Sequence, residues 1–289
     1  MSPVAWPGAQ VNASAGGRAY QLNVHERGPG DGPPILFLHG FPTSSRDWAK
    51  IAPAFRDRRA FYPDLLGFGR SEKPKIRYSY GLHAALLQDM LQKRGVNQVD
   101  VVAHDYSVTL AQVLLAQEHE PGALRIGRVV FLNGGVFGRL HRKQRAHRLL
   151  SLPVFGPWIA RKVTPRALTQ GLNAIAGRPH SWSAEEGAAH WRDMADNDGL
   201  ARLPCLLHYI EDRKRYGSEW EAALIAAADR CGFVWGPDDP VSGAPMLDAV
   251  IAQIPNARTV GLPGVGHYPH WEAPNETAAA IRTLLEPNG

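Results

Sequence analysis

The chain has 289 residues, 44% of them hydrophobic, and a formal net charge of +5. This composition suits one large globular domain, or one domain with an insertion, and excludes a chain too polar to bury a core. Two cysteines are too few for a disulfide framework, and no run approaches the roughly 20 apolar residues of a membrane span. Residues 1–17 carry no signal-peptide pattern. We therefore expect a cytoplasmic protein.

The chain begins with a stretch rich in proline, glycine, alanine and serine, residues 1–17, which predicts a flexible arm. Strands and helices then alternate. Apolar and alternating runs predict strands at 19–25, 35–38, 61–64, 101–104 and 128–132. Helices are expected after Ser44 or Ser45 as N-cap, over 80–93 and directly after the strand at 101–104. This alternation predicts an α/β fold with a mostly parallel, doubly wound sheet and ligands at the carboxyl ends of its strands.

From about residue 136 to 230 the alternation stops. The segment has helical patterns, several tryptophans and prolines, and no convincing strand, so we expect a helical cap over the strand ends. The sheet resumes at 232–235, followed by a helix at 245–254, a short strand at 259–260 and a closing helix at 275–285. The predicted domains are a core of 18–135 and 231–289 and a cap of 136–230.

A tight turn between the strand at 101–104 and the next helix is the central feature of the sequence. Such a strand-turn-helix elbow holds one side chain above the sheet edge and needs small residues two positions before and after it. Ala103 and Ser107 flank Asp105 in this way. The tip is therefore predicted to be Asp105, which can attack carbon and form an ester that water then cleaves. The alternative is a half-buried aspartate that only caps the helix.

Two further loops after strands bring the partners that such a nucleophile needs. Asp238 and Asp239 follow the strand at 232–235, and His267 lies in a glycine-rich turn near the end of the chain. A histidine can activate water, provided that a carboxylate orients its ring. Asp239 is the preferred carboxylate, with Asp238 as its exposed neighbour. Asn133, an amide after the neighbouring strand, cannot carry that charge.

The loop His39-Gly40-Phe41-Pro42 supplies the other half of the expected site. The backbone N–H groups of Phe41 and Tyr106 are predicted to form an oxyanion hole. His104 is expected to support the elbow, and His270 to lie at the surface.

With these residues in place, the sequence from about Gly17 onward resembles an α/β-hydrolase of the epoxide hydrolase and haloalkane dehalogenase branch. It is most similar to the mesoderm-specific-transcript hydrolases. The shared motifs are His39–Ser45 with Asp47-Trp48, Leu66–Gly69, His104–Tyr106, Asn133–Gly135, Asn197–Gly199, Tyr209-Ile210 with Arg213-Lys214, Gly236-Pro237 with Asp239-Pro240, and His267–Pro269. The resemblance implies an α/β-hydrolase fold with a helical cap inserted after strand 6, and an aspartate nucleophile.

The resemblance also guides the choice of substrate-binding residues. Epoxide hydrolases use cap tyrosines that hydrogen-bond the epoxide oxygen, and Tyr209 and Tyr216 lie in a similar cap segment. His39 and Trp48, which belong to the shared motifs, are expected to contact substrate as well. Haloalkane dehalogenases instead hold halide with a tryptophan after the nucleophile, where this chain has Tyr106.

Three functions remain open at this point: opening of an epoxide or related strained ring, dehalogenation, and a binding or sensing module without turnover. A serine esterase ranks last, because it would need Ser107 at the tip of the elbow. The expected ligand is a small, largely apolar molecule, with no cofactor, no metal and no nucleic acid. The basic run at 139–148 predicts at most a weak contact with a membrane surface. The oligomeric state is left open.

Overall fold

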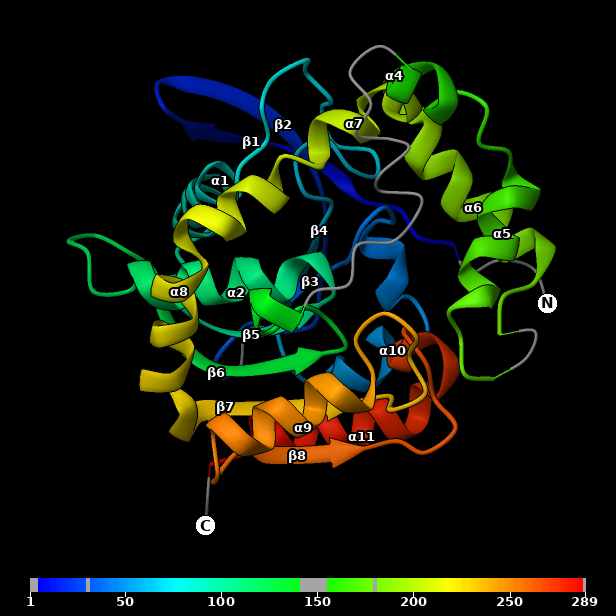
Figure 1. The fold of residues 1–289 in the computed structure, drawn as a ribbon. Helices are drawn as coiled ribbons and strands as arrows, with labels where there is room; N and C mark the ends of the chain where they lie inside the picture. Colours follow the sequence, from blue (N-terminus) through cyan, green and yellow to red (C-terminus); the bar gives the residue numbers. More distant parts are fainter. Residues whose placement is uncertain (1–4, 30–31, 141–154, 179–180, 288–289) are drawn as a thin grey trace.

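The computed structural model describes residues 5–29, 32–140, 155–178 and 181–287 (Figure 1). Its strands form one sheet in the order β1-β2-β4-β3-β5-β6-β7-β8. The strands are β1 (Ala9–Ala15), β2 (Arg18–Arg27), β3 (Ile35–Leu38), β4 (Ala60–Pro63), β5 (Gln98–His104), β6 (Arg125–Leu132), β7 (Cys231–Trp235) and β8 (Arg258–Gly261). From β4 to β8 all neighbours pair in parallel, whereas β1 and β2 are antiparallel at one edge. The mostly parallel α/β-hydrolase sheet is therefore confirmed.

The N-terminal stretch differs from its prediction as a loose arm. Residues 9–15 form β1, which pairs with β2 from Ala9 opposite Val24 to Ala15 opposite Arg18. Between the two strands Gly16 and Gly17 have φ of 56° and 76°, a region that glycine adopts without steric cost. The backbone of β1 forms hydrogen bonds with the backbone of β2. Because these bonds do not involve side chains, the small residues that suggested disorder do not prevent the strand from forming.

Alternate side chains of the central strands enter two separate cores, because successive residues of a strand point to opposite faces. On one face, side chains such as Leu36 and Leu38 pack with α1 (Tyr80–Gln92), α2 (Tyr106–Gln117) and α9 (Ala244–Gln253). On the other, Ile35 and Phe37 pack with α11 (Pro274–Leu285) and two 3₁₀ turns, η1 (Ser45–Trp48) and η2 (Ala52–Phe55).

These two turns replace the helix expected after Ser44. Ser44 does act as N-cap, and its side chain accepts a hydrogen bond from the backbone N–H of Arg46. The 3₁₀ turn η1 ends at Trp48, and Pro53 lies in the first turn of η2. A proline has no N–H to donate inside a longer helix, so a continuous helix is disfavoured here.

The regular elements described between β6 and β7 are all helices or 3₁₀ turns. They are η3 (Gly138–Leu140), α4 (Phe155–Ala160), α5 (Pro165–Ala174), α6 (Ala184–Ala195), η4 (Asp196–Arg202), α7 (Leu203–Leu206), α8 (Tyr209–Ala226) and η5 (Ala228–Arg230). In the parts of the chain with a described structure, no helix is long and apolar enough to cross a membrane. Most of the basic run at 139–148 lies outside the described residues. The division into a core and a cap remains a prediction.

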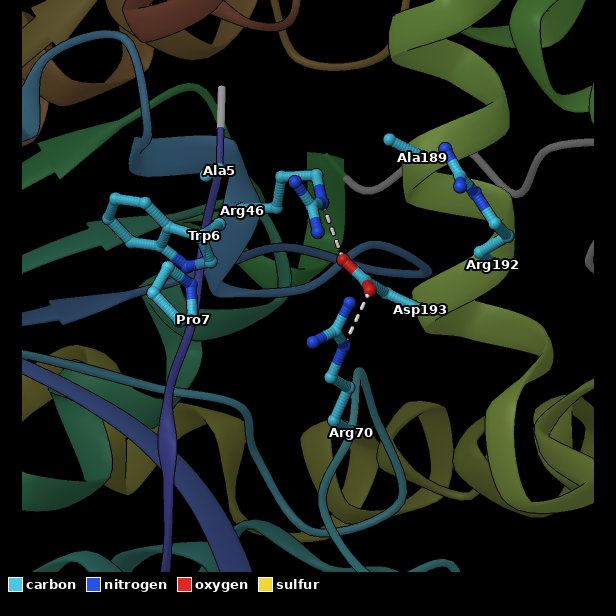
Figure 2. A pocket seen from close by; sticks show the side chains of 8 residues that line it. All are labelled: Ala5, Trp6, Pro7, Arg46, Arg70, Ala189, Arg192 and Asp193. Atoms are coloured by element: carbon cyan, nitrogen blue, oxygen red, sulfur yellow. Dashed lines mark hydrogen bonds and ion pairs between the residues drawn. The ribbon is translucent and has the colours of Figure 1, made fainter. Parts of the chain in front are cut away.

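Ion pairs and helix packing attach this segment to the sheet. Asp193 of α6 accepts a hydrogen bond from Arg46 at 2.5 Å and another from Arg70 at 2.9 Å (Figure 2). Because Arg46 and Asp193 are both buried, loss of either partner would leave an unpaired buried charge. Farther along, α8 lies across α2 (Figure 1). The helix α2 begins directly after Asp105, so α8 is placed next to the elbow.

Candidate active site

The elbow has the geometry that its sequence predicts. β5 ends at His104 and α2 begins at Tyr106, so Asp105 alone makes the turn. Its backbone has φ 47° and ψ −108°, a conformation that costs a residue with a side chain of order 1–3 kcal/mol. The Asp105 side chain is 22% exposed, whereas its flanking residues Ala103 and Ser107 are fully buried. The strained turn therefore presents Asp105 at the end of the strand.

Close backbone neighbours explain why small residues surround the elbow. A Cβ atom added at Gly134 would lie 2.8 Å from the Asp105 carbonyl oxygen, and one added at Gly40 would lie 2.9 Å from the Asp105 Cβ. Ser107 points away from the tip, and its hydroxyl donates to the His39 carbonyl at 2.6 Å. Ser107 thus braces the turn, while the carboxylate of Asp105 remains available.

His267 connects Asp105 to Asp239, although the three residues lie on loops far apart in the chain. The Nδ1 of His267 lies 2.7 Å from Oδ2 of Asp239, and Nε2 lies 3.7 Å from Oδ1 of Asp105. Asp239 also accepts hydrogen bonds from the Ser242 hydroxyl at 2.6 Å and the Asn133 side-chain amide at 3.0 Å. Asp239 is buried whereas Asp238 is exposed, so Asp239 is the carboxylate that orients the histidine.

Burial and pairing shift the pKa values of this pair in opposite directions. Burial alone would lower the pKa of His267, but the charges of Asp239 and Asp105 outweigh it and raise that pKa to about 9. Burial alone would raise the pKa of Asp239, but His267 and hydrogen bonds lower it to about 2. Near neutral pH His267 is thus an imidazolium and Asp239 a carboxylate. Loss of the Asp105 charge in an ester would remove one cause of the raised His267 pKa.

One of the two expected oxyanion donors reaches Asp105 in the structure. The Phe41 N–H donates to Oδ2 of Asp105 at 2.9 Å. Tyr106 opens α2, and its backbone N–H makes no hydrogen bond within the described residues, as is usual for the first turn of a helix. The Phe41 donor therefore marks Oδ2 as the oxygen on which charge can be stabilised, and leaves Oδ1 facing His267.

One known protein family matches most of this chain. The alpha/beta hydrolase family matches residues 35–280, a range that holds Asp105, Asp239 and His267.

The chain belongs to the alpha/beta hydrolase family.

Two relatives cover most of this hydrolase. The putative hydrolase LipZ of Mycobacterium tuberculosis is 37% identical over 262 residues, which are 89% of this chain and 90% of LipZ. The human mesoderm-specific transcript homolog protein is 32% identical over 250 residues, 83% of this chain and 75% of the relative. The resemblance to the mesoderm-specific-transcript proteins is thus confirmed.

Solved structures extend the likeness to the fold. The haloalkane dehalogenase DbeA of Bradyrhizobium elkani superposes with a TM-score of 0.76 at 22% identity, covering 96% of this chain and 97% of DbeA. The epoxide hydrolase CorEH gives a TM-score of 0.75 at 19% identity, covering 96% and 98%. At these identities the two structures show a shared fold alone.

The expected substrate-binding residues of the hydrolase separate into two groups. Tyr209 lines a small cavity together with Asp105 and Tyr106. Tyr216, seven residues further along α8, is 39% exposed and lines a different cavity with Arg77 and Trp220. Tyr209 is therefore positioned to contact a substrate at Asp105, whereas Tyr216 is not.

His39 and Trp48, which were predicted to contact substrate, do not lie at the cavity. His39 is fully buried, with Nδ1 2.8 Å from the Gly40 carbonyl and Nε2 accepting from the Leu65 N–H at 3.1 Å. Both ring nitrogens of His39 are therefore engaged in holding loops. Trp48 is fully buried in the core beside α11, where its ring packs on Phe37. Neither residue lines the cavity at Asp105.

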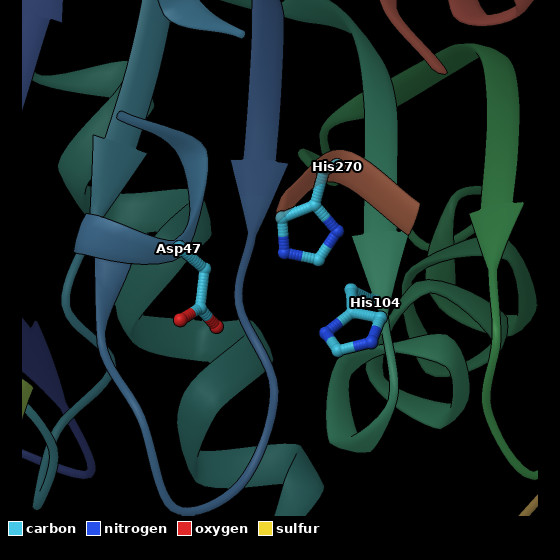
Figure 3. Close-up of side chains that lie close together, drawn as sticks. All are labelled: Asp47, His104 and His270. Atoms are coloured by element: carbon cyan, nitrogen blue, oxygen red, sulfur yellow. The ribbon is translucent and has the colours of Figure 1, made fainter. Parts of the chain in front are cut away.

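Behind the triad lies a buried polar cluster of Asp47, His104 and His270 (Figure 3). The prediction that His270 lies at the surface is wrong, because the loop folds it fully inside. The donor atoms of the three residues lie within 4.8 Å of one another, the one such group in the described residues that could hold a metal ion. The Nε2 of His104 donates to the His267 carbonyl at 2.7 Å. His104, which the sequence predicts to support the elbow, thus holds the His267 loop through this hydrogen bond.

Glu272 is a supporting residue that the sequence did not indicate. Its buried carboxylate accepts backbone N–H groups of the His267 loop, from Gly266 and Tyr268, each at 2.9 Å. The same carboxylate accepts the N–H groups of Gly177 at 2.8 Å and Arg178 at 3.2 Å. Glu272 thus ties the histidine loop to the segment after α5. Only the folded chain brings these donors together.

We expect Asp239→Asn to lower turnover by about 10⁴-fold, the cost of the equivalent change in a serine-protease triad. The amide would also remove the negative charge that raises the His267 pKa, so that this pKa falls well below about 9. Steady-state kinetics and an NMR titration of the imidazole measure the two effects. Asp238→Asn, a change to an exposed neighbour, is the matched control. Equal losses in both variants would contradict the assignment of Asp239.

Proposed function

We propose that this hydrolase opens an epoxide with water through an ester on Asp105. The observation that carries the proposal is the hydroxyl of Tyr209. The cavity at Asp105 is lined by three tyrosines. The Tyr80 hydroxyl donates to the Tyr106 carbonyl at 3.3 Å, and the Tyr106 hydroxyl lies 2.9 Å from His83 Nδ1. The Tyr209 hydroxyl makes no hydrogen bond to any described residue.

A free tyrosine hydroxyl next to a carboxylate suits epoxide chemistry. Burial raises the pKa of Tyr209 well above 10, so the hydroxyl keeps its proton and can donate it. In the first step Oδ1 of Asp105 attacks a ring carbon, and a new C–O bond forms as the ring C–O bond breaks. The ring oxygen takes the proton of Tyr209. An alkyl ester on Asp105 results.

The second step returns every group to its starting state. While Asp105 is uncharged in the ester, His267 releases its resting proton to solvent, and it takes one back once the carboxylate is restored. Water attacks the ester carbon and gives a proton to the neutral His267, while the Phe41 N–H stabilises the charge on Oδ2. The acyl C–O bond breaks, and His267 returns its proton to the departing alcohol. The proton left on the Asp105 carboxyl group restores the Tyr209 hydroxyl. The sum of the two steps is an epoxide plus water giving a diol.

The proposal also has to explain how a substrate enters, because the described cavity at Asp105 is very small. The cavity at Asp105 has a volume of about 10 Å³, roughly the space that one water molecule needs. Three cavities of about 350–490 Å³ are not lined by Asp105. One of them, of about 420 Å³, adjoins the site, because Tyr209 and Arg213 line both cavities. Substrate entry therefore requires movement of the α8 side chains that line the site.

Dehalogenation by the same first step is the second candidate. A halide leaves as an anion and takes no proton, so it would use the Tyr209 hydroxyl only as a hydrogen-bond donor and not as an acid. DbeA shares the fold, but Tyr106 follows Asp105 where such enzymes place a tryptophan. The free hydroxyl favours the epoxide.

Tyr209→Phe tests this choice. We expect the variant to lose about 100-fold in kcat/KM towards terminal epoxides, within the usual range for a general acid. Rates are measured with a panel of epoxides, neutral and carboxylated, and with the matching bromoalkanes. Tyr216→Phe, an exposed tyrosine on the same helix, is the control and should behave as the wild type. Halide release that is insensitive to Tyr209→Phe, with no epoxide turnover, would favour the dehalogenase.

A further inference from the structure

Arg213 is a charged residue of the candidate site that takes no part in the proposed epoxide chemistry. It lies four residues after Tyr209 on α8, a spacing that places both side chains on one helix face. Arg213 lines the same cavity as Asp105 and Tyr209. The cavity at Asp105, for which a largely apolar ligand was expected, therefore has a guanidinium in its wall.

A hydrogen bond to the loop that follows β6 holds the guanidinium of Arg213 in position. The Nη2 of Arg213 donates to the Gly135 carbonyl at 2.6 Å. A Cβ atom added at Gly135 would lie 2.4 Å from Nη1, so a residue with a side chain there would displace the arginine. A guanidinium has five N–H donors, and this contact uses one of them.

No carboxylate among the described residues forms an ion pair with Arg213. Three other partly or fully buried arginines have such partners, Arg46 with Asp193, Arg58 with Asp100 and Arg230 with Glu118, whereas the partly buried Arg128 and Arg258 have none among the described residues. Two acidic residues line a cavity together with Arg213: Glu221 in a second, larger cavity beside α8, and Asp105 in the site. Of these two charges, only that of Asp105 disappears when an ester forms. A partly buried cation without a fixed counterion is costly to keep unless a ligand supplies the charge.

We propose that Arg213 binds a carboxylate of the substrate, so that the hydrolase acts on small epoxy acids. A planar guanidinium can hold a carboxylate through two parallel N–H bonds, and its single positive charge matches one carboxylate. A phosphate, with up to two charges, would leave a net negative charge next to Asp105. The arginine also offsets the repulsion between an anionic substrate and the anionic nucleophile. The inference rests on the proposed epoxide chemistry for the identity of the reacting group.

A pair of nearly isosteric substrates isolates the charge. Glycidate and glycidamide are the same epoxide with a carboxylate or an uncharged amide. We expect the wild type to prefer glycidate in kcat/KM by about 100-fold, the scale of a pair of charge-assisted hydrogen bonds. Arg213→Gln should remove that preference by lowering glycidate turnover far more than glycidamide turnover, and Arg213→Lys should fall between. Arg215→Gln, an exposed arginine two residues on, should match the wild type.

A binding measurement separates this inference from the epoxide proposal. Calorimetry with propanoate and propanamide reports carboxylate recognition without any reaction. Propanoate binding that is lost in Arg213→Gln supports the inference even if no epoxide is turned over. Epoxide turnover without any preference for the carboxylate, or equal losses for both substrates in Arg213→Gln, would overturn it. The arginine would then only brace α8 against Gly135.

Discussion

His267→Gln is expected to stop the reaction halfway, with the substrate attached to Asp105. The attack of Asp105 on carbon needs no base, whereas cleavage of the ester requires a group that takes a proton from water. His267, oriented by Asp239 at 2.7 Å and 3.7 Å from Oδ1 of Asp105, is the described group in position to do so. Turnover should fall by about 10²–10⁴-fold, while the first step continues.

Intact mass spectrometry after mixing this variant with a reactive epoxide measures the effect. A substrate-sized increase in mass should appear, and peptide mapping should place it on Asp105. His119→Gln, which changes a histidine whose side chain is 89% exposed, should accumulate no adduct. In a serine-type mechanism the histidine is needed in the first step as well, so no adduct would form. Absence of adducts with epoxides, lactones and haloalkanes alike would favour a binding module without turnover.

The second large effect concerns the nucleophile itself. We expect Asp105→Ala to abolish hydrolysis and adduct formation, because no other carboxylate lines the described cavity. Ser107→Ala should keep most of the activity, since the Ser107 hydroxyl donates to the His39 carbonyl at 2.6 Å and does not face the cavity. The measurement is the diol formed per enzyme over a long incubation.

The two substitutions control each other, because each removes a polar group from the same turn. Thermal unfolding shows whether both variants remain folded. Because alanine also has a Cβ atom, Asp105→Ala leaves the backbone strain of the turn in place. An inactive Ser107→Ala protein together with an active Asp105→Ala protein would move the nucleophile to serine, and the epoxide proposal would fall.

The sequence alone determined the elbow, the order of the three candidate triad residues and the alternation of strands and helices. These features are local: small residues on either side of Asp105, an apolar run before it and a helical pattern after it fix the turn. Parallel strands then bring the loops with Asp239 and His267 to the same edge of the sheet. The order of these motifs along the chain was therefore enough to predict that they meet.

What only the tertiary structure decided depends on contacts between segments far apart in the chain. The burial of Trp48 and His270 follows from loops that pack behind the sheet, and nothing in their own sequence distinguishes them from exposed residues. The choice of Tyr209 over Tyr216 follows from where α8 crosses α2, which sets the face of the helix that meets Asp105. The charge of Arg213 enters the site for the same reason. A sequence pattern specifies which residues share a helix face, but the packing of that helix determines what the face contacts.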